Sequence, residues 1–317
     1  MLLEIAMPPL TEPATPIPLS RVIGNAAAAE AIRTAMIGAK MRNQTLGHIL
    51  LQGPSGVGKT HFAKLIAEDA GASMTRIHGP SITRRNLPDL MRAFIQLNPN
   101  DVLFIDEIHT LPTEAMECLY EAMEEMRVSI PTADGQDSPA FVTVPLSPFV
   151  LVGATTRPGK LTEPLQMRFV RTITLATYSI EELAMIIEMQ SFGTGASGQQ
   201  LTDCERLEIA TRSRGRARKA IRFAEVCLDH KLTGGSVLSA FSELKIGPHG
   251  ETESDRTYIR TLAEKLNGGP AGISAIIATS GLDPLLVERD IEPFLLDAGV
   301  IKRTPRGRQI IGTLSPA

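Results

Sequence analysis

The stretch GPSGVGKT, residues 53–60, constrains this chain more than any other, because its spacing is that of a loop that folds around phosphate groups. It lies between an apolar run, residues 48–52, and a helix-forming segment. The glycines let several backbone N–H groups converge on one anion at the positive end of that helix. Lys59 is expected to reach the β- and γ-phosphates of ATP and Thr60 to bind Mg²⁺. The predicted phosphate-binding residues are Gly53, Pro54, Gly56, Gly58, Lys59 and Thr60. The alternative is a glycine-rich turn with a chance lysine.

Two carboxylates end a second apolar run, VLFIDEIH, residues 102–109. Asp106 and Glu107 would lie at the C-terminal edge of a strand, where open α/β sheets bind ligands. We expect Asp106 to hold Mg²⁺ and Glu107 to polarise the water that attacks the γ-phosphate. Alone, such a pair is often a helix cap, but behind a phosphate loop the pattern favours catalysis. His109 is interpreted as a local structural or coupling residue, because no metal-ligand spacing surrounds it.

A third apolar run, residues 148–156, ends in two threonines. The hydroxyl of Thr156 is expected beside the γ-phosphate, although an isolated threonine there would be an ordinary strand end. Arg168 and Arg218 are candidates to complete the site. Each is equally well explained as a surface charge.

Strand-like and helical segments alternate through the first half of the chain, which predicts a parallel sheet covered by helices on both faces. Two β-prone runs around an Asp-Gly turn predict a hairpin insertion at 128–146. The expected organisation is a proline-rich leader at 1–20, a large α/β domain at 21–176, an all-α domain at 177–247 and a mixed C-terminal domain at 248–317.

The composition of the chain restricts the cellular compartment and the binding partners that we expect. A length of 317 residues suits two or three domains, and a net charge of -3 means that a polyanion would be bound by local basic patches. Three cysteines without a CxxC pair argue against zinc or disulfides and favour a reducing cytoplasm. No run approaches ~18 apolar residues, so we expect a soluble, cytoplasmic protein without a membrane segment.

The segment KRTPRGR, residues 302–308, places four cations within seven residues around a proline and a glycine. This pattern predicts a rigid basic turn that faces an anion, because proline restricts the backbone and glycine permits tight turns. A solvated basic tail is the alternative.

The stretches LFIDEIH, LVGATTRPGKLTEPL and RTPRGR, together with the hairpin before the second of them, resemble the AAA+ ATPases. Within these, they closely resemble the RuvB family of Holliday-junction branch-migration motors, over about residues 20–312. The resemblance implies an α/β AAA+ ATPase domain, a helical lid domain and a C-terminal winged-helix domain. In the winged helix the basic turn would be the wing, which binds duplex DNA with little sequence preference. The DNA-binding residues would be Arg303, Arg306 and Arg308.

The resemblance also implies roles for single residues and for partners. Thr156 would be the sensor-1 residue, Arg218 the sensor-2 arginine and Arg168 an arginine finger that acts in trans within a hexameric ring. Ile23 would lie at the edge of the adenine site, and the hairpin would dock a RuvA-like junction-binding protein. The chain departs from the family pattern at Gln166, where an arginine is usual, which indicates a distant member.

The function that follows is an ATP-driven translocase on double-stranded DNA that promotes Holliday-junction branch migration in recombination and repair. A clamp loader or helicase loader is the alternative, but it would need a protein-binding C-terminal domain, whereas the basic turn favours DNA. An unfoldase lacks support because residues 78–100 contain no aromatic-hydrophobic-glycine pore loop. A nucleotide switch without turnover is disfavoured by Glu107 and Arg168.

Overall fold

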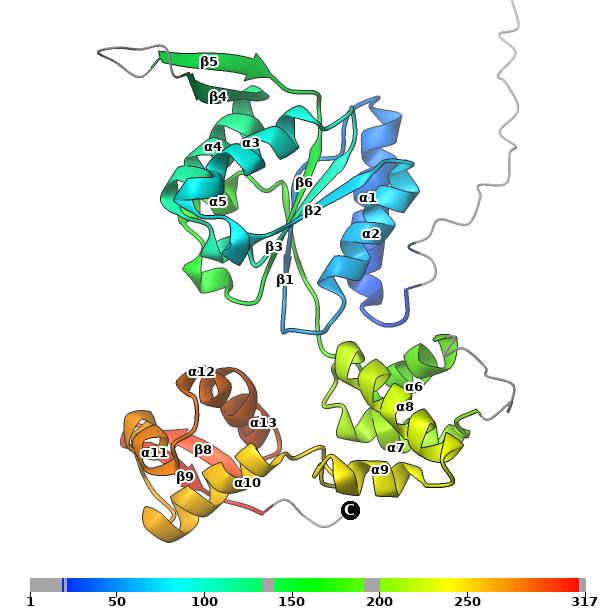
Figure 1. Ribbon diagram of the computed structural model, residues 1–317, viewed down its shortest axis with the longest axis vertical. Coiled ribbons are helices and arrows are strands. Elements are labelled where there is room, and N and C mark those ends of the chain that lie inside the picture. Colours follow the sequence, from blue (N-terminus) through cyan, green and yellow to red (C-terminus); the bar gives the residue numbers. More distant parts are fainter. Residues whose placement is uncertain (1–18, 20–21, 133–139, 191–199, 314–317) are drawn as a thin grey trace, which may run out of the picture. The chain divides into compact units, whose positions relative to one another are not determined.

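The computed structural model describes residue 19 and residues 22–132, 140–190 and 200–313. The chain divides into two compact units, Met1–Ala176 and Thr177–Ala317. Figure 1 shows a sheet with flanking helices in the first unit, and helices with a small two-stranded sheet in the second.

The first unit is built on a five-stranded parallel sheet with the order β2-β3-β6-β1-β7. The three predicted strands are confirmed as β1 (Ile49–Gln52), β3 (Val102–Asp106) and β6 (Val150–Thr155). Sequence reasoning missed β2 (Met74–His78) and β7 (Arg171–Thr174). Both are short, lie at the edges of the sheet and expose most of their side chains, so neither shows an apolar run.

Helices cover both faces of this sheet, as alternating strands and helices predict. On one face, α2 contacts β3 and β6 (Figure 1). On the other face, a cluster of buried hydrophobic side chains joins α3 and α4 to the strands. The large side chains Phe94 and Phe149 contact each other edge to face in this core. The helices of the unit are α1 (Ala26–Met41), α2 (Lys59–Ala70), α3 (Leu87–Ile95), α4 (Thr113–Glu125) and α5 (Glu163–Met167).

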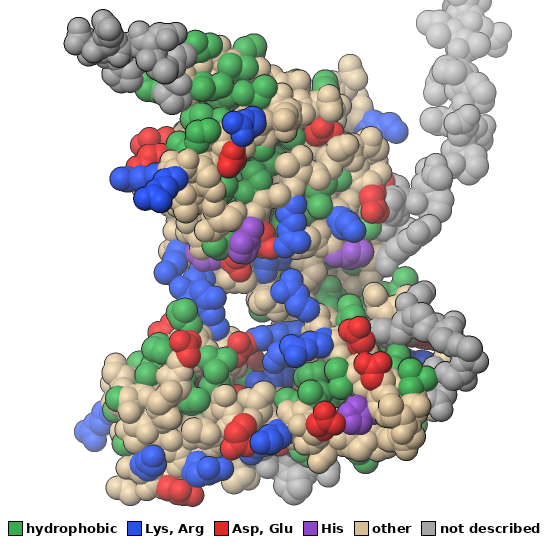
Figure 2. Space-filling model, in the orientation of Figure 1, with side chains coloured by type: hydrophobic (Ala, Val, Ile, Leu, Met, Phe, Trp, Pro, Cys, Tyr) green, Lys and Arg blue, Asp and Glu red, His purple; other side chains and the backbone are tan. Residues whose placement is uncertain are grey.

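A hairpin of β4 (Arg127–Thr132) and β5 (Ala140–Pro145) lies between α4 and β6 in the sequence. The predicted Asp-Gly turn lies outside the described residues. Near the hairpin base Val128 is buried, but Phe141 and Val142 expose 59% and 52% of their surface. Figure 2 shows hydrophobic side chains gathered on the surface around these strands.

The described part of residues 177–247 is helical, as expected. Three of its helices begin with reciprocal capping boxes, Ser179 with Glu182, Thr202 with Glu205 and Ser236 with Ser239, which satisfy N–H groups that a helix leaves unpaired at its start. The helices are α6 (Ile180–Met189), α7 (Asp203–Arg212), α8 (Ala217–Leu232) and α9 (Val237–Glu243).

The C-terminal part has the helix and strand order of a winged helix. Its core packs Tyr258, Leu262 and Ile276 against Ile291 and Leu295. A π-type turn extends α10, and another joins α12 to α13. The elements are α10 (Glu253–Arg260), α11 (Ile273–Ser280), α12 (Pro284–Leu286), α13 (Glu292–Asp297), β8 (Ile301–Thr304) and β9 (Gly307–Ile310).

Two ion pairs join this winged helix to the helical part of the same unit. The guanidinium of Arg214 pairs with Asp255, which is buried and also accepts hydrogen bonds from the backbone N–H and hydroxyl of Thr252. Arg216 pairs with Asp290, which is partly exposed. Both arginines lie in the loop between α7 and α8.

Candidate active site

The loop between β1 and α2 has the shape that its glycines predict. Gly53, Gly56 and Gly58 all have positive φ angles, which glycine adopts at little cost. At Gly53 a Cβ atom would lie 2.4 Å from the backbone oxygen of Leu175, so no other residue fits without moving the chain. The loop leads directly into the N-terminus of α2, whose dipole and free N–H groups favour an anion.

Lys59 begins α2, and its side chain curls back into this loop. The Lys59 Nζ atom donates hydrogen bonds to the backbone oxygens of Gly53 and Pro54, both at 2.8 Å. The residue is buried, so its ammonium group is held where the loop backbone turns. Thr60 follows on the first turn of the helix.

Asp106 ends β3 and faces a cation from the neighbouring strand. Its Oδ2 atom lies 2.9 Å from Nη2 of Arg76 on β2. Sequence reasoning missed Arg76, because the strand that carries it shows no apolar pattern. Asp106 thus has a positively charged neighbour that compensates its carboxylate.

Glu107 and Thr156 follow adjacent strands, β3 and β6, and the structure brings them into contact. The Thr156 hydroxyl donates to both carboxylate oxygens of Glu107, at 3.1 and 2.9 Å, and the Thr156 backbone N–H donates to Oε2 at 3.2 Å. Glu107 has a φ of 52°, a left-handed conformation that is uncommon for this residue type and is found at functional sites. The turn directs the carboxylate back over the C-terminal edge of the sheet.

His109 belongs to the same cluster. Its Nδ1 atom lies 3.2 Å from Oε2 of Glu107 and 2.9 Å from the hydroxyl of Thr155. The imidazole is nearly buried and links the two strand ends. This agrees with its interpretation as a local structural or coupling residue.

The donor set at this edge suits a magnesium nucleotide. Thr60 and Asp106 offer the oxygen ligands that Mg²⁺ prefers, and the glycine-rich loop leads into the N-terminus of α2, which favours an anion. Within the described residues no group of three or more His, Cys, Asp and Glu side chains could hold a metal ion.

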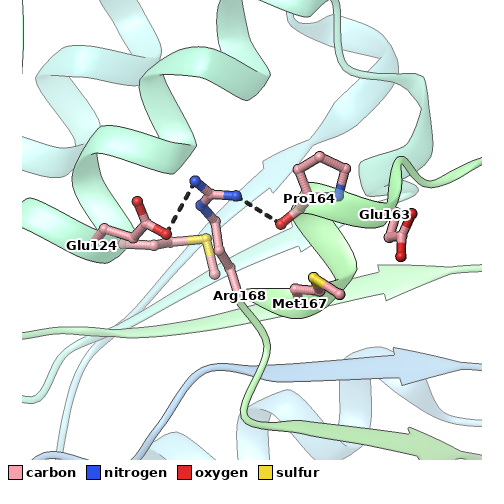
Figure 3. A pocket seen from close by; sticks show the side chains of 6 residues that line it. Glu124, Glu163, Pro164, Met167 and Arg168 are labelled. Carbon is pink, nitrogen blue, oxygen red and sulfur yellow. Dashed lines mark hydrogen bonds and ion pairs between the residues drawn. The ribbon is translucent and has the colours of Figure 1, made fainter.

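Arg168 follows α5 and lies at a pocket of about 490 Å³ (Figure 3). One Nη atom donates to the backbone oxygen of Pro164 at 2.8 Å, and the other pairs with Glu124 at 3.0 Å. The guanidinium carbon lies 4.2 Å from the ring centre of Tyr120. The arginine is thus held against its own α4 and α5, beside walls formed by Met123 and Met167.

Two further candidates lie elsewhere in the fold. Ile23 is partly buried in the segment before α1, in the first unit. Arg218 is exposed on the first turn of α8, in the second unit.

The predicted basic turn forms the wing, β8 and β9. Arg303 and Arg308 face each other across the strands, and both pair with the buried carboxylate of Glu292 on α13. Tyr258 also donates to Glu292, at 3.0 Å. Burial raises the pKa of Glu292, but hydrogen bonds from Arg308, Tyr258 and Arg303 outweigh it and place that pKa below its usual value.

This arrangement gives Arg308 a partner within its own domain, and its predicted contact with DNA stays a prediction. Its side chain is 21% exposed and makes two hydrogen bonds to Glu292, so its charge is already compensated. Arg306 lies in the turn between the two strands and is exposed. Within the described residues, no ion pair engages Arg306.

The fold and the site define a P-loop ATPase domain joined, through a helical domain, to a winged helix. The family model described as "Holliday junction DNA helicase RuvB P-loop domain" matches residues 14–175, and the "RuvB C-terminal winged helix domain" matches residues 249–313. The chain belongs to the RuvB family. The expected fold class and family are confirmed.

Comparison with similar proteins supports the same family assignment. The Holliday junction branch migration complex subunit RuvB of Lactobacillus gasseri is 38% identical over 301 residues, covering 92% of this chain and 86% of that protein. The subunit of the same name from Saccharopolyspora erythraea is 40% identical over 299 residues, covering 92% and 82%. The solved structure of the Thermotoga maritima RuvB Holliday junction branch migration motor matches with a TM-score of 0.76 and 34% identity, covering 91% of this chain and 92% of that one.

Proposed function

We propose that this protein is an ATP-driven translocase on double-stranded DNA that promotes Holliday-junction branch migration in recombination and repair, in the cytoplasm. The observation that carries the proposal is Glu107, held by Thr156 at the sheet edge that also carries the phosphate loop and Asp106. This arrangement supports Glu107 as the base that serves the proposed triphosphate site. Membership of the RuvB family and the presence of a winged helix support DNA as the substrate.

In the proposed reaction, the loop N–H groups and Lys59 bind the triphosphate, and Thr60 and Asp106 hold Mg²⁺. The metal ion, when bound, neutralises charge on the β- and γ-phosphate oxygens. Glu107 orients the attacking water and takes its proton on a carboxylate oxygen. Thr156 holds that carboxylate, and we assign its hydroxyl the role of reporting on the γ-phosphate.

A complete site needs a second subunit. Arg168 extends from α5, after β6, and we assign it the stabilisation of charge on the phosphoryl group of a neighbouring subunit, a role worth ~10³–10⁵ in rate in analogous enzymes. Arg218 contributes from the helical lid, and Ile23 borders the adenine. A hexameric ring satisfies these requirements for every site.

We assign the wing to DNA and the hairpin to the partner. Arg306 at the tip of the wing contacts phosphates, while Arg303 is shared between Glu292 and the DNA surface. Phe141 and Val142, neighbours in β5 whose side chains alternate between the two faces, expose apolar surface on the hairpin, and we assign this hairpin the docking of a RuvA-like junction-binding protein. Phosphate contacts position the protein without reading sequence, which suits a motor that moves along DNA.

The experiment is a steady-state ATPase assay without DNA, with duplex DNA, and with a four-way junction plus a RuvA-like protein, together with a gel assay of strand separation. We expect ATP hydrolysis that DNA stimulates, and junction dissociation that requires ATP. Arg168→Ala should abolish both. Hydrolysis that is unaffected by DNA or junction, combined with binding to a sliding clamp or a replicative helicase, would instead support the loader function.

A further inference from the structure

Tyr120 on α4 forms a flat platform beneath the guanidinium group of Arg168. The guanidinium carbon is 4.2 Å from the ring centre, a distance typical of a cation–π contact. The tyrosine hydroxyl lies 3.0 Å from that of Thr162, which immediately precedes α5. The ring is therefore fixed both by its own helix and by the start of the element that carries Arg168.

The other two contacts of Arg168 use its N–H groups. Pro164 and Glu124 each accept from one Nη atom. Glu124 is 56% exposed, and an ion pair so open to water contributes little to the position of its partner. A phosphate oxygen would compete with Glu124 for the same N–H group. The ring contact, in contrast, uses the face of the guanidinium and leaves its N–H edge available.

We propose that Tyr120 is a positioning residue for Arg168: its ring sets the plane of the guanidinium so that the N–H edge can meet the triphosphate of a neighbouring subunit. The inference rests on the trans role of Arg168 in the proposed function. An arginine side chain has many rotamers, and fixing them in advance removes an entropic cost from the reaction. A misplacement of about 1 Å can lower a rate by ~10²-fold.

The test compares the steady-state ATPase of the full-length chain with three variants. Tyr120→Leu removes the ring, Tyr120→Phe keeps it, and Glu124→Gln removes the exposed charge beside the same guanidinium. We expect Tyr120→Leu to lower kcat about tenfold with the KM for ATP unchanged, and the other two to stay within about threefold of the parent. Equal loss in Tyr120→Phe and Tyr120→Leu, or a loss confined to Glu124→Gln, would overturn the proposal.

Mixed assemblies separate positioning in trans from damage to the subunit's own fold. A Tyr120→Leu subunit keeps its own hydrolytic residues, whereas a Glu107→Gln subunit keeps its arginine and platform. An equal mixture should therefore exceed the mean ATPase rate of the two separate variants. The reference mixture is Arg168→Ala with Glu107→Gln.

The reference mixture tells the two failures apart. If it regains activity while the Tyr120→Leu mixture does not, Tyr120 acts on its own subunit and the positioning role is wrong. If Arg168→Ala alone retains full activity, the trans arginine itself is wrong, and the proposed ring mechanism fails with it.

Discussion

The Thr156 hydroxyl donates to both carboxylate oxygens of Glu107, at 3.1 and 2.9 Å, across neighbouring strands of one sheet. Together with the Thr156 backbone N–H and His109, this hydroxyl fixes the orientation of the proposed base. Because β3 and β6 are parallel, both residues lie at the edge where the phosphate loop also begins.

Replacement of Glu107 by Gln should leave ATP binding intact and lower hydrolysis by at least ~10²-fold. The amide keeps the size of the side chain but cannot take a proton from water. The measurement pairs equilibrium binding of a fluorescent ATP analogue with single-turnover hydrolysis. Normal turnover by the variant would refute the catalytic assignment.

Thr156→Val should lower kcat about ten- to a hundredfold, because a hydrogen bond to a charged carboxylate is lost. Thr156→Ser is the matched control, since it keeps the hydroxyl and removes a methyl group. We expect the serine variant to retain most of the activity. If valine and serine behave alike in the ATPase assay, the hydroxyl does not hold Glu107 during turnover.

The wing arginines should differ in their effects on DNA binding. Arg306→Ala should reduce the magnitude of the slope of log K against log salt for duplex DNA by about 0.9, as expected for one lost phosphate contact. The free energy of unfolding of the Arg306→Ala variant should equal that of the parent, because no ion pair engages Arg306 within the described residues. Fluorescence anisotropy across a salt series measures the slope.

Arg308→Ala should act on stability instead. It removes two hydrogen bonds from the buried carboxylate of Glu292 and should cost about 2–4 kcal/mol, with Arg303 and Tyr258 left to compensate in part. The free energy of unfolding from denaturant titration tests this. A stable Arg308→Ala variant with a reduced salt slope would return Arg308 to the DNA contacts.

Lys219 gives the stability a pH dependence. Burial, followed by the nearby charges of Arg214 and Arg216, lowers its pKa from 10.5 to about 8. Between these two values the unfolded chain binds more protons than the folded one, so this residue makes stability rise with pH from about 8 to about 10.5. Below pH 8 its charge is a constant cost.

Lys219→Met should therefore raise the thermal midpoint at pH 7 by about 2–4 °C, and by much less near pH 10.5. Lys265→Met, at an exposed lysine of the same unit, is the control. Differential scanning calorimetry measures the thermal midpoints of both variants and the parent at the two pH values. An equal shift at both pH values would mean that added apolar packing, rather than the lysine charge, is responsible.

The nucleotide motifs were predictable because their signals are local. Glycines with positive φ, a buried strand and a helix start stand within a few residues of one another at 53–60. The strands β3 and β6 are recognisable in the sequence as apolar runs, since parallel strands are buried on both faces. The fold class followed from the alternation of such segments.

What sequence reasoning missed depends on pairings between distant residues. Arg76 meets Asp106 only because β2 pairs with β3, and β2 carries no apolar pattern. Likewise, nothing local to Arg308 reveals Glu292, which approaches it through the packing of α13 on the wing. Charge counting at 302–308 therefore could not show that Arg308 is paired with a carboxylate of its own domain.

No helix within the described residues is long and apolar enough to cross a membrane.

The pairing of Arg214 with Asp255 restricts how this protein can be recombined by design. The Asp255 carboxylate accepts from the backbone N–H of Thr252 in the capping box of its own helix and neutralises an arginine from the lid at the same time, and its side chain is only 1% exposed. A chimera that takes its winged helix from one parent and its lid from another would bury an unmatched charge unless both partners travel together. The natural unit of exchange is therefore the whole segment from Thr177 onward, rather than the winged helix alone.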